Sequence, residues 1–215
     1  VRKNLREKGI WIKNNEELTD LEREVCFAYF RDVLLKQVSI RFLSGMDGLP
    51  ELKNNQTVLM GKLDEGYYSI VSFPEEMPAL LALENGSTGF IGIRTPDVLM
   101  EFFDKWMLPF QAKEKLLLRI TRNAEFREGE EDELLKADFR SQIQKMLRER
   151  STQPPVRLEI RGDCTDCFRT ELIAKFKIPK KHCFTTTAPL EYEFMDELKE
   201  VLPKATLRTL SYPLY

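Results

Sequence analysis

The sequence has little cysteine and almost no histidine: four cysteines and one histidine in 215 residues. Small extracellular domains that depend on disulfides carry cysteine at a much higher density. We therefore expect ordinary thiols in a reducing compartment and predict a cytoplasmic protein. No stretch approaches the roughly 20 apolar residues of a membrane-spanning helix. The charged start of the chain also lacks the pattern of a signal peptide, so we predict no transmembrane segment.

An excess of positive charge is missing as well. The chain has 33 Lys+Arg against 35 Asp+Glu, a formal net charge of −2. Domains that bind nucleic acid usually carry a strong basic excess, so we predict no nucleic-acid partner. The hydrophobic fraction of 42% and the charged fraction of 32% are typical of a globular protein with one large domain or two small ones.

Motifs that cradle phosphate or supply a nucleophile are absent too. The sequence holds no Gly-x-x-x-x-Gly-Lys-Ser/Thr, no Gly-x-Gly-x-x-Gly, no Gly-x-Ser-x-Gly and no His-Glu-x-x-His. The single imidazole, His182, follows Lys180 and Lys181 in a predicted loop. An enzyme that passes a phosphoryl group through histidine surrounds that imidazole with buried cations. We therefore predict a solvated loop position for His182 in preference to a catalytic one, and we assign no catalytic residue.

Periodicity and turn signals indicate interleaved helices and strands without a regular βαβ repeat. Thr19 and Glu22 have the spacing of a capping box. Helices are predicted from about Asp20 to about Leu35, Pro96 to Trp106, about Glu131 to about Arg150, Cys167 to Phe176 and Glu191 to Val201. Strands are predicted over Thr57–Leu63 and Tyr67–Phe73, joined as a hairpin at Gly66, then over Gly89–Arg94, Lys115–Thr121 and Val156–Ile160, with a loop from Arg41 to Asn55. The expected fold class is α+β, a mixed sheet with packed helices.

Two cysteines stand in a Cys-x-x-Cys pattern, Cys164 and Cys167, where a predicted strand gives way to a helix. The same position lowers the pKa of a cysteine in thioredoxin-like redox sites. Together with His182 and Cys183 the pair also supplies four residue types that bind zinc. Neither the βαβ pattern of a redox protein nor the usual spacing of zinc ligands is present, so we predict ordinary thiols and no metal site.

The most specific run is Arg119-Ile-Thr-Arg122-Asn123-Ala-Glu, at the end of a predicted strand. Arg119, Arg122 and Asn123 are candidates for phosphate binding through charge-assisted hydrogen bonds. The same arginines are equally able to pair with the acidic segment Glu125 to Glu133. On the residues alone we favour the structural interpretation, because the acidic partners are close in sequence.

The order of these segments resembles the middle, or head, domain of type 1 polyphosphate kinases. The resemblance covers the Arg119 run, the acidic stretch, the long helix and Pro-Val-Arg-Leu-Glu-Ile, from Leu116 to Ile160. It extends upstream over Ile70–Pro78 and Phe90–Trp106, and downstream over Ala188–Leu190 and Phe194–Met195. The match is weak before Val58 and good from Leu116 to Leu190. The sequence departs from the family between Val38 and Lys53, where a Thr-Pro-rich stretch is usual and where Ser39 to Ser44 stand here.

The resemblance implies a fold like that of phosphohistidine phosphatases. It also implies a parent enzyme that reversibly transfers the terminal phosphate of ATP to polyphosphate in the presence of magnesium. In that enzyme the phosphoryl group passes through a histidine, and this histidine belongs to the catalytic half, which consists of two C-terminal domains. Those domains are absent here, so the resemblance implies a non-catalytic assembly domain, inactive alone and without a cofactor of its own. The implied partners are other domains of the same chain and, in the parent enzyme, a second copy of it.

The domain division expected from the resemblance has two parts. Residues 1–40 are a lead-in segment and helix from an N-terminal helical domain, and residues 41–215 are the head domain. We expect the chain to be a segment of a longer polypeptide. Two alternatives stay open: a phosphate-polymer binding module, and a small redox or zinc protein built on the cysteine pair.

Overall fold

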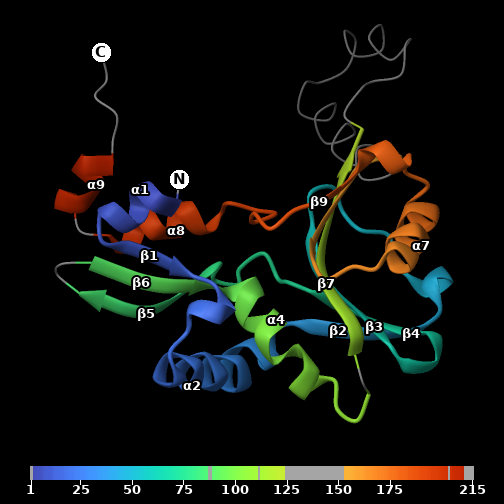
Figure 1. Ribbon diagram of the computed structural model, residues 1–215, viewed down its shortest axis with the longest axis horizontal. Helices are drawn as coiled ribbons and strands as arrows, with labels where there is room; N and C mark the ends of the chain where they lie inside the picture. Colours follow the sequence, from blue (N-terminus) through green and yellow to red (C-terminus); the bar gives the residue numbers. More distant parts are fainter. Residues whose placement is uncertain (1, 87–88, 111, 124–152, 203, 211–215) are drawn as a thin grey trace, which may run out of the picture.

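The computed structural model describes residues 2–86, 89–110, 112–123, 153–202 and 204–210 (Figure 1). Two sheets and the helices packed on them make up this part of the chain, as the predicted α+β class requires. The predicted helix over 131–150 lies outside the described residues. The expected likeness to phosphohistidine phosphatases stays a prediction.

A six-stranded sheet has the order β2-β4-β3-β7-β8-β9. All neighbouring strands in it are antiparallel except β8 and β9, which are parallel. Its strands are β2 Ser39–Ser44, β3 Thr57–Leu63, β4 Tyr67–Ser72, β7 Ala112–Arg122, β8 Pro155–Gly162 and β9 Cys183–Thr185. The long strand β7 lies in the middle and connects the predicted hairpin, β3 and β4, to the C-terminal part of the sheet.

A second sheet of three strands has the order β1-β6-β5. Strand β1, Ile10–Lys13, runs parallel to β6, Gly89–Arg94, and β5, Leu80–Gly86, is antiparallel to β6. Helices α1, Arg2–Glu7, and α8, Phe194–Val201, cover one face of this sheet (Figure 1). A short helix, α9, Lys204–Leu210, follows α8.

Alternate side chains of β7 contribute to two separate hydrophobic cores. Leu116, Leu118 and Ile120 point to one face, where α7, Asp166–Phe176, packs on the sheet. Leu117 points to the other face, towards α4, Thr95–Trp106. This second core also holds residues of both sheets, so it joins the two sheets into one body.

Residues 1–40 are part of this second core. Helix α2, Asp20–Tyr29, begins at the predicted capping box, continues through a π-helical turn and ends as a short helix, α3, at Gln37. Its buried face contributes Cys26, Phe30 and Leu34 to the core beneath α4. The predicted boundary at residue 40 therefore does not separate two hydrophobic cores of this chain. As a boundary between two domains of the parent protein, it stays a prediction.

Most predicted elements are confirmed, but the loop predicted from Arg41 to Asn55 is wrong at its start. Residues 39–44 form the edge strand β2, because they pair antiparallel with β4 along six positions. The glycines that suggested a loop begin only at Gly45, just after that strand. Strand β5 was not predicted; it depends on pairing with β6, which the local pattern does not reveal. None of the described helices combines the length and apolar character needed to cross a membrane.

A glycine on β3 permits the close packing of α4 on the six-stranded sheet. A Cβ atom added to Gly61 would lie 2.4 Å from Cζ of Phe103, a fully buried ring on α4. It would also lie 2.8 Å from Oγ of Ser69 on the neighbouring strand. The ring has no free space to move into, since it is enclosed by the core.

We predict that Gly61→Ala lowers the free energy of unfolding by about 1–3 kcal/mol, the usual cost of overpacking a core. Urea denaturation of the purified protein measures the change. Gly48→Ala is the matched control, because the nearest side-chain atom to its new Cβ is at an ordinary 3.6 Å. Equal stability of the two variants would contradict the close-packing argument.

Candidate functional site

The predicted phosphate-binding arginine Arg122 is buried, with 6% of its surface exposed. Its Nε and Nη2 donate to the carbonyl oxygen of Leu52, at 3.1 and 2.8 Å, and its Nη1 donates to the carbonyl oxygen of Gln153 at 2.6 Å. Its backbone N–H donates to Oδ1 of Asn54 at 2.8 Å. The guanidinium therefore satisfies backbone carbonyls of two loops and ties them to the end of β7.

Arg119 and Arg122 do not face a common space. Nη1 of Arg119 donates to the carbonyl oxygen of Leu190, which belongs to the core on the α4 face. Leu52, the partner of Arg122, belongs to the core on the α7 face. The two guanidinium groups thus lie on opposite faces of the sheet. Phosphate binding by the three residues stays a prediction, and the described contacts favour the structural interpretation.

A buried carboxylate, Asp97, connects the two sheets. Asp97 is 2% exposed and stands in the first turn of α4. Its Oδ2 is 2.5 Å from Nη2 of Arg94 at the end of β6, and its Oδ1 is 2.5 Å from Nη1 of Arg161 on β8. Asn15 donates to the backbone carbonyl of Asp97 at 3.1 Å. We call Arg94, Asp97 and Arg161 the charged junction.

The charged junction was not predicted from the sequence. The spacing of Arg94 and Asp97, three residues apart around a helix start, was a local signal that could have indicated the first pair. Arg161 is far from both in sequence, and nothing in the local pattern points to it. Beside the junction lies an open hollow of about 720 Å³, bordered by Arg161, Thr185, Thr186 and Thr187 among others.

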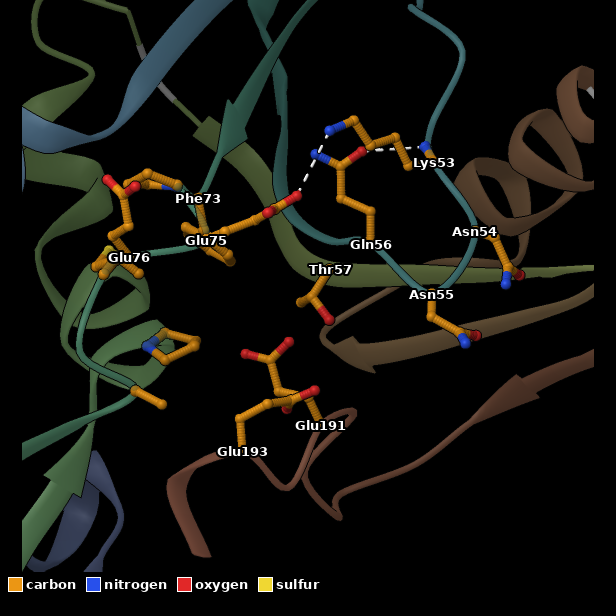
Figure 2. Close-up of a pocket in the computed structure, with 14 residues that line it drawn as sticks. Lys53, Asn54, Asn55, Gln56, Thr57, Phe73, Glu75, Glu76, Glu191 and Glu193 are labelled. Atoms are coloured by element: carbon orange, nitrogen blue, oxygen red, sulfur yellow. Dashed lines mark hydrogen bonds and ion pairs between the residues drawn. The ribbon is translucent and has the colours of Figure 1, made fainter. Parts of the chain in front are cut away.

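A second open cleft, of about 600 Å³, lies between the segment that joins β4 to β5 and the segment before α8 (Figure 2). Its lining residues are Lys53, Asn54, Asn55, Gln56, Thr57, Phe73, Pro74, Glu75, Glu76, Met77, Ala79, Pro96, Glu191 and Glu193. Glu197 on α8 fixes one wall, since its carboxylate accepts the backbone N–H groups of Ala79 and Leu80 at 2.7 and 3.0 Å.

The carboxylate of Glu191 lies in the part of this cleft that faces Thr57. Burial raises its pKa, and the nearby charge of Glu193 raises it further. The hydroxyl of Thr57 and the positive charges of Arg119 and Arg94 act in the opposite direction. In Figure 2 the Glu191 side chain points towards Thr57, with Glu193 beside it. The cleft presents carboxylate and hydroxyl oxygens but no thiol or imidazole.

The Cys-x-x-Cys pair lies at the start of α7, as predicted, in surroundings that do not activate a thiol. Burial, followed by the charge of Glu114, raises the pKa of Cys164 to about 11. Sγ of Cys167 is 3.5 Å from Oε1 of Glu171. A reactive thiol needs a lowered pKa, so the redox alternative has no support. The described residues contain no group of three or more His, Cys, Asp or Glu side chains able to hold a metal ion.

Glu171 is instead the centre of a polar contact between α7 and the hairpin. It accepts from Nζ of Lys62 at 2.8 Å and from the hydroxyl of Tyr68 at 2.7 Å. These hydrogen bonds outweigh burial and lower the pKa of Glu171, while burial and the same carboxylate raise the pKa of Tyr68 to about 12. The Lys62 ammonium also lies 5.3 Å from the ring centre of Phe168.

His182 closes a 3₁₀ turn, Lys180–His182, that leads into β9. Its side chain is half-buried, and both preceding lysines are exposed. Its backbone N–H donates to the carbonyl oxygen of Pro179 at 2.8 Å. His182 lines neither of the two clefts described above. The predicted loop position is therefore confirmed.

Two sheets joined by the charged junction, with helices packed on them, define a domain of α+β type. The family model of the polyphosphate kinase middle domain matches residues 22–198. The chain belongs to this family.

Two individual relatives are also polyphosphate kinases. The chain is 25% identical over 211 residues to a polyphosphate kinase of Staphylococcus haemolyticus, a match that covers 92% of this chain and 27% of that protein. It is 21% identical to a polyphosphate kinase of Lactiplantibacillus plantarum, over 98% of this chain and 29% of that protein. The chain thus spans less than a third of the length of these relatives.

A solved structure shows the same fold. The crystal structure of polyphosphate kinase from Porphyromonas gingivalis superposes with a TM-score of 0.65 at 14% identity. The match covers 95% of this chain and 29% of that one. At this identity the likeness concerns the fold alone.

We predict that Asp97→Asn lowers the free energy of unfolding by about 3 kcal/mol, because it removes the carboxylate charge that the buried Arg94 and the partly buried Arg161 share. Thermal and urea unfolding measure the loss. The control is Asp104→Asn, which removes an exposed carboxylate paired with Lys115 and is expected to cost less than about 1 kcal/mol. Equal losses would show that the charged junction does not hold the sheets.

A pH-dependent difference is expected for Glu171→Gln. The folded-state pKa of Glu171 is lowered, so its contribution to stability is present above the ordinary value of 4.5 and is lost as the pH falls through the lowered value. The variant should therefore be less stable than the wild type at pH 7, and the difference should shrink steadily below about pH 4.5. Urea titrations across this range measure it; a difference independent of pH would contradict the assignment.

Proposed function

We propose that this chain serves as the middle domain of a polyphosphate kinase, as a framework that positions other parts of the enzyme. In this proposal the parent enzyme transfers the terminal phosphate of ATP reversibly to polyphosphate. Membership of the middle-domain family and the coverage of less than a third of its relatives support a domain of a larger enzyme.

The main observation behind a non-catalytic role is the position of the single histidine. A phosphoryl-accepting imidazole needs cations fixed around it to stabilise the transferred group. His182 lies on a surface turn whose two lysines are exposed, while Arg122, Arg94 and Arg161 are bound elsewhere. The histidine that carries the phosphoryl group is therefore expected in another part of the enzyme, which is the part that becomes a phosphoprotein.

The nucleotide and the metal belong to that other part as well. Magnesium prefers carboxylate oxygens and phosphates, and the described residues offer no group of three suitable side chains. Nothing among the described residues therefore supports a divalent cation held by this domain. ATP binding is assigned to the parent enzyme and not to this domain.

The proposed partners are other domains of the same polypeptide and a second copy of the enzyme, in the cytoplasm. An exposed apolar surface supports a contact role: Phe42 on the edge strand β2, Tyr67 on β4, and Leu108 and Phe110 after α4. The rings of Phe42 and Phe110 lie 5.5 Å apart while remaining about half exposed. Exposed aromatic groups of this kind often mark protein contacts.

We predict that His182→Ala in the full-length protein leaves phosphoenzyme formation from γ-³²P-ATP within about twofold of wild type, because the imidazole takes no part in the transfer. Mass spectrometry of the labelled wild type should place the phosphohistidine outside residues 1–215. Label on His182, or loss of labelling in a His182→Ala variant that unfolds at the wild-type temperature, would refute the proposal. His182→Gln is the second variant, in case alanine weakens the turn.

A further inference from the structure

One stretch of the chain departs strongly from the nearly balanced charge of the whole. Residues 172–190 contain four lysines and one histidine but no aspartate or glutamate. This stretch runs from the second half of α7 through the 3₁₀ turn Lys180–His182 and strand β9 to the segment before α8. A run of one sign in a chain of net charge −2 indicates a locally cationic surface.

Three of these lysines, Lys177, Lys180 and Lys181, are exposed, and none of them forms an ion pair within the described part of the chain. We call these three residues the lysine patch. The fourth lysine, Lys175, donates to the backbone carbonyl oxygen of Asp47 at 3.1 Å and is not counted in the patch. The patch therefore presents three positive charges to the solvent without a carboxylate bound to them.

Buried side chains fix the backbone beneath the lysine patch. Phe176 and Ile178, on either side of Lys177, are 8% and 3% exposed and belong to the core on the α7 face. The backbone N–H groups of Lys177 and Ile178 both donate to carbonyl oxygens of α7. Because the backbone is held in place, a ligand that binds the lysines has to order their side chains alone, which limits the entropy that binding costs.

The lysine patch is a surface and not an enclosed site. It lies at the end of the six-stranded sheet where the parallel strands β8 and β9 begin (Figure 1). None of its lysines lines either of the two clefts described above. A lysine ammonium is a point charge without the fixed fork of arginine, so it attracts phosphate without selecting one geometry. Three such charges on an open surface suit a long anion that crosses all of them.

The aromatic surroundings distinguish between two kinds of anionic polymer. Single-stranded nucleic acid is held by aromatic rings that stack on its bases as well as by charge. Phe184 is the one exposed aromatic side chain described between residues 153 and 190, and the guanidinium of Arg157 lies over its ring, 4.7 Å from the centroid. One face of this ring is thus already covered. Polyphosphate has no bases, and its binding requires positive charge alone.

We propose that the lysine patch binds the polyphosphate chain outside the catalytic half of the enzyme. This proposal rests on the proposed function, because that function supplies the polymer. Several phosphates of one chain contact the patch at once, so the attachment depends on chain length and weakens as the salt concentration rises. The end of the polymer stays free to reach the catalytic histidine in another part of the enzyme.

Binding of fluorescently labelled long-chain polyphosphate to the full-length protein, measured over a range of salt concentrations, tests the proposal. The combined variant Lys177→Gly, Lys180→Gln and Lys181→Gln should bind about tenfold more weakly at moderate salt. The slope of log affinity against log salt should become shallower by about 2, since each lost contact removes about 0.7. Lys177 has a φ of 53°, a conformation that glycine adopts readily, so this variant should keep the wild-type unfolding temperature.

The matched control combines Lys3→Gln, Lys8→Gln and Lys36→Gln, which removes the same charge from exposed lysines elsewhere on the chain. Its binding should equal that of the wild type, and tripolyphosphate, too short to cross the patch, should bind all three proteins equally. Equal losses in the two combined variants, an unchanged salt slope, or single-stranded DNA that binds the patch as tightly as polyphosphate would overturn the proposal. If labelling by γ-³²P-ATP persists in that case, the lysine patch is refuted while the proposed function stands.

Discussion

The arrangement of this domain depends on one carboxylate, that of Asp97, shared by two arginines from different sheets. Removing three charges from water is expensive, and the ion pairs compensate only when all partners are in place. Asp97 gains further from its position in the first turn of α4, where the helix dipole favours negative charge. Because Arg94 ends β6 and Arg161 lies on β8, the geometry of the carboxylate sets how the two sheets meet.

Arg119 and Arg122 also form their hydrogen bonds inside the domain. Arg122 binds the carbonyl oxygens of Leu52 and Gln153, and Arg119 binds that of Leu190. Because Nε, Nη1 and Nη2 of Arg122 all donate to carbonyl oxygens, this guanidinium keeps its charge but has few directed N–H donors left for a phosphate. These contacts favour the structural interpretation of Arg122.

The sequence could predict those parts of the fold that local signals specify. The capping box of Thr19 and Glu22, and Gly66 with its positive φ between β3 and β4, are encoded within a few residues. Strand β2 was missed because its pairing with β4 is made 23 or more positions away and its outer edge has no neighbour among the described strands.

Less of the candidate site than of the fold could be predicted from the sequence. That Arg119 and Arg122 face opposite sides follows from the two-residue period of a strand, so this part was predictable. The pairing of Asp97 with Arg161 was not, because it depends on how the two sheets pack.

The cleft lined by Glu75, Glu76, Glu191 and Glu193 is acidic because the neighbouring arginines form their contacts inside the domain. Arg119 donates to the carbonyl oxygen of Leu190, the residue before Glu191, and its positive charge lowers the pKa of Glu191 against the larger effect of burial. The domain thus keeps its arginines inside, where they fix the sheets, and leaves carboxylates at the cleft. A surface of this sign repels anions and attracts cationic groups.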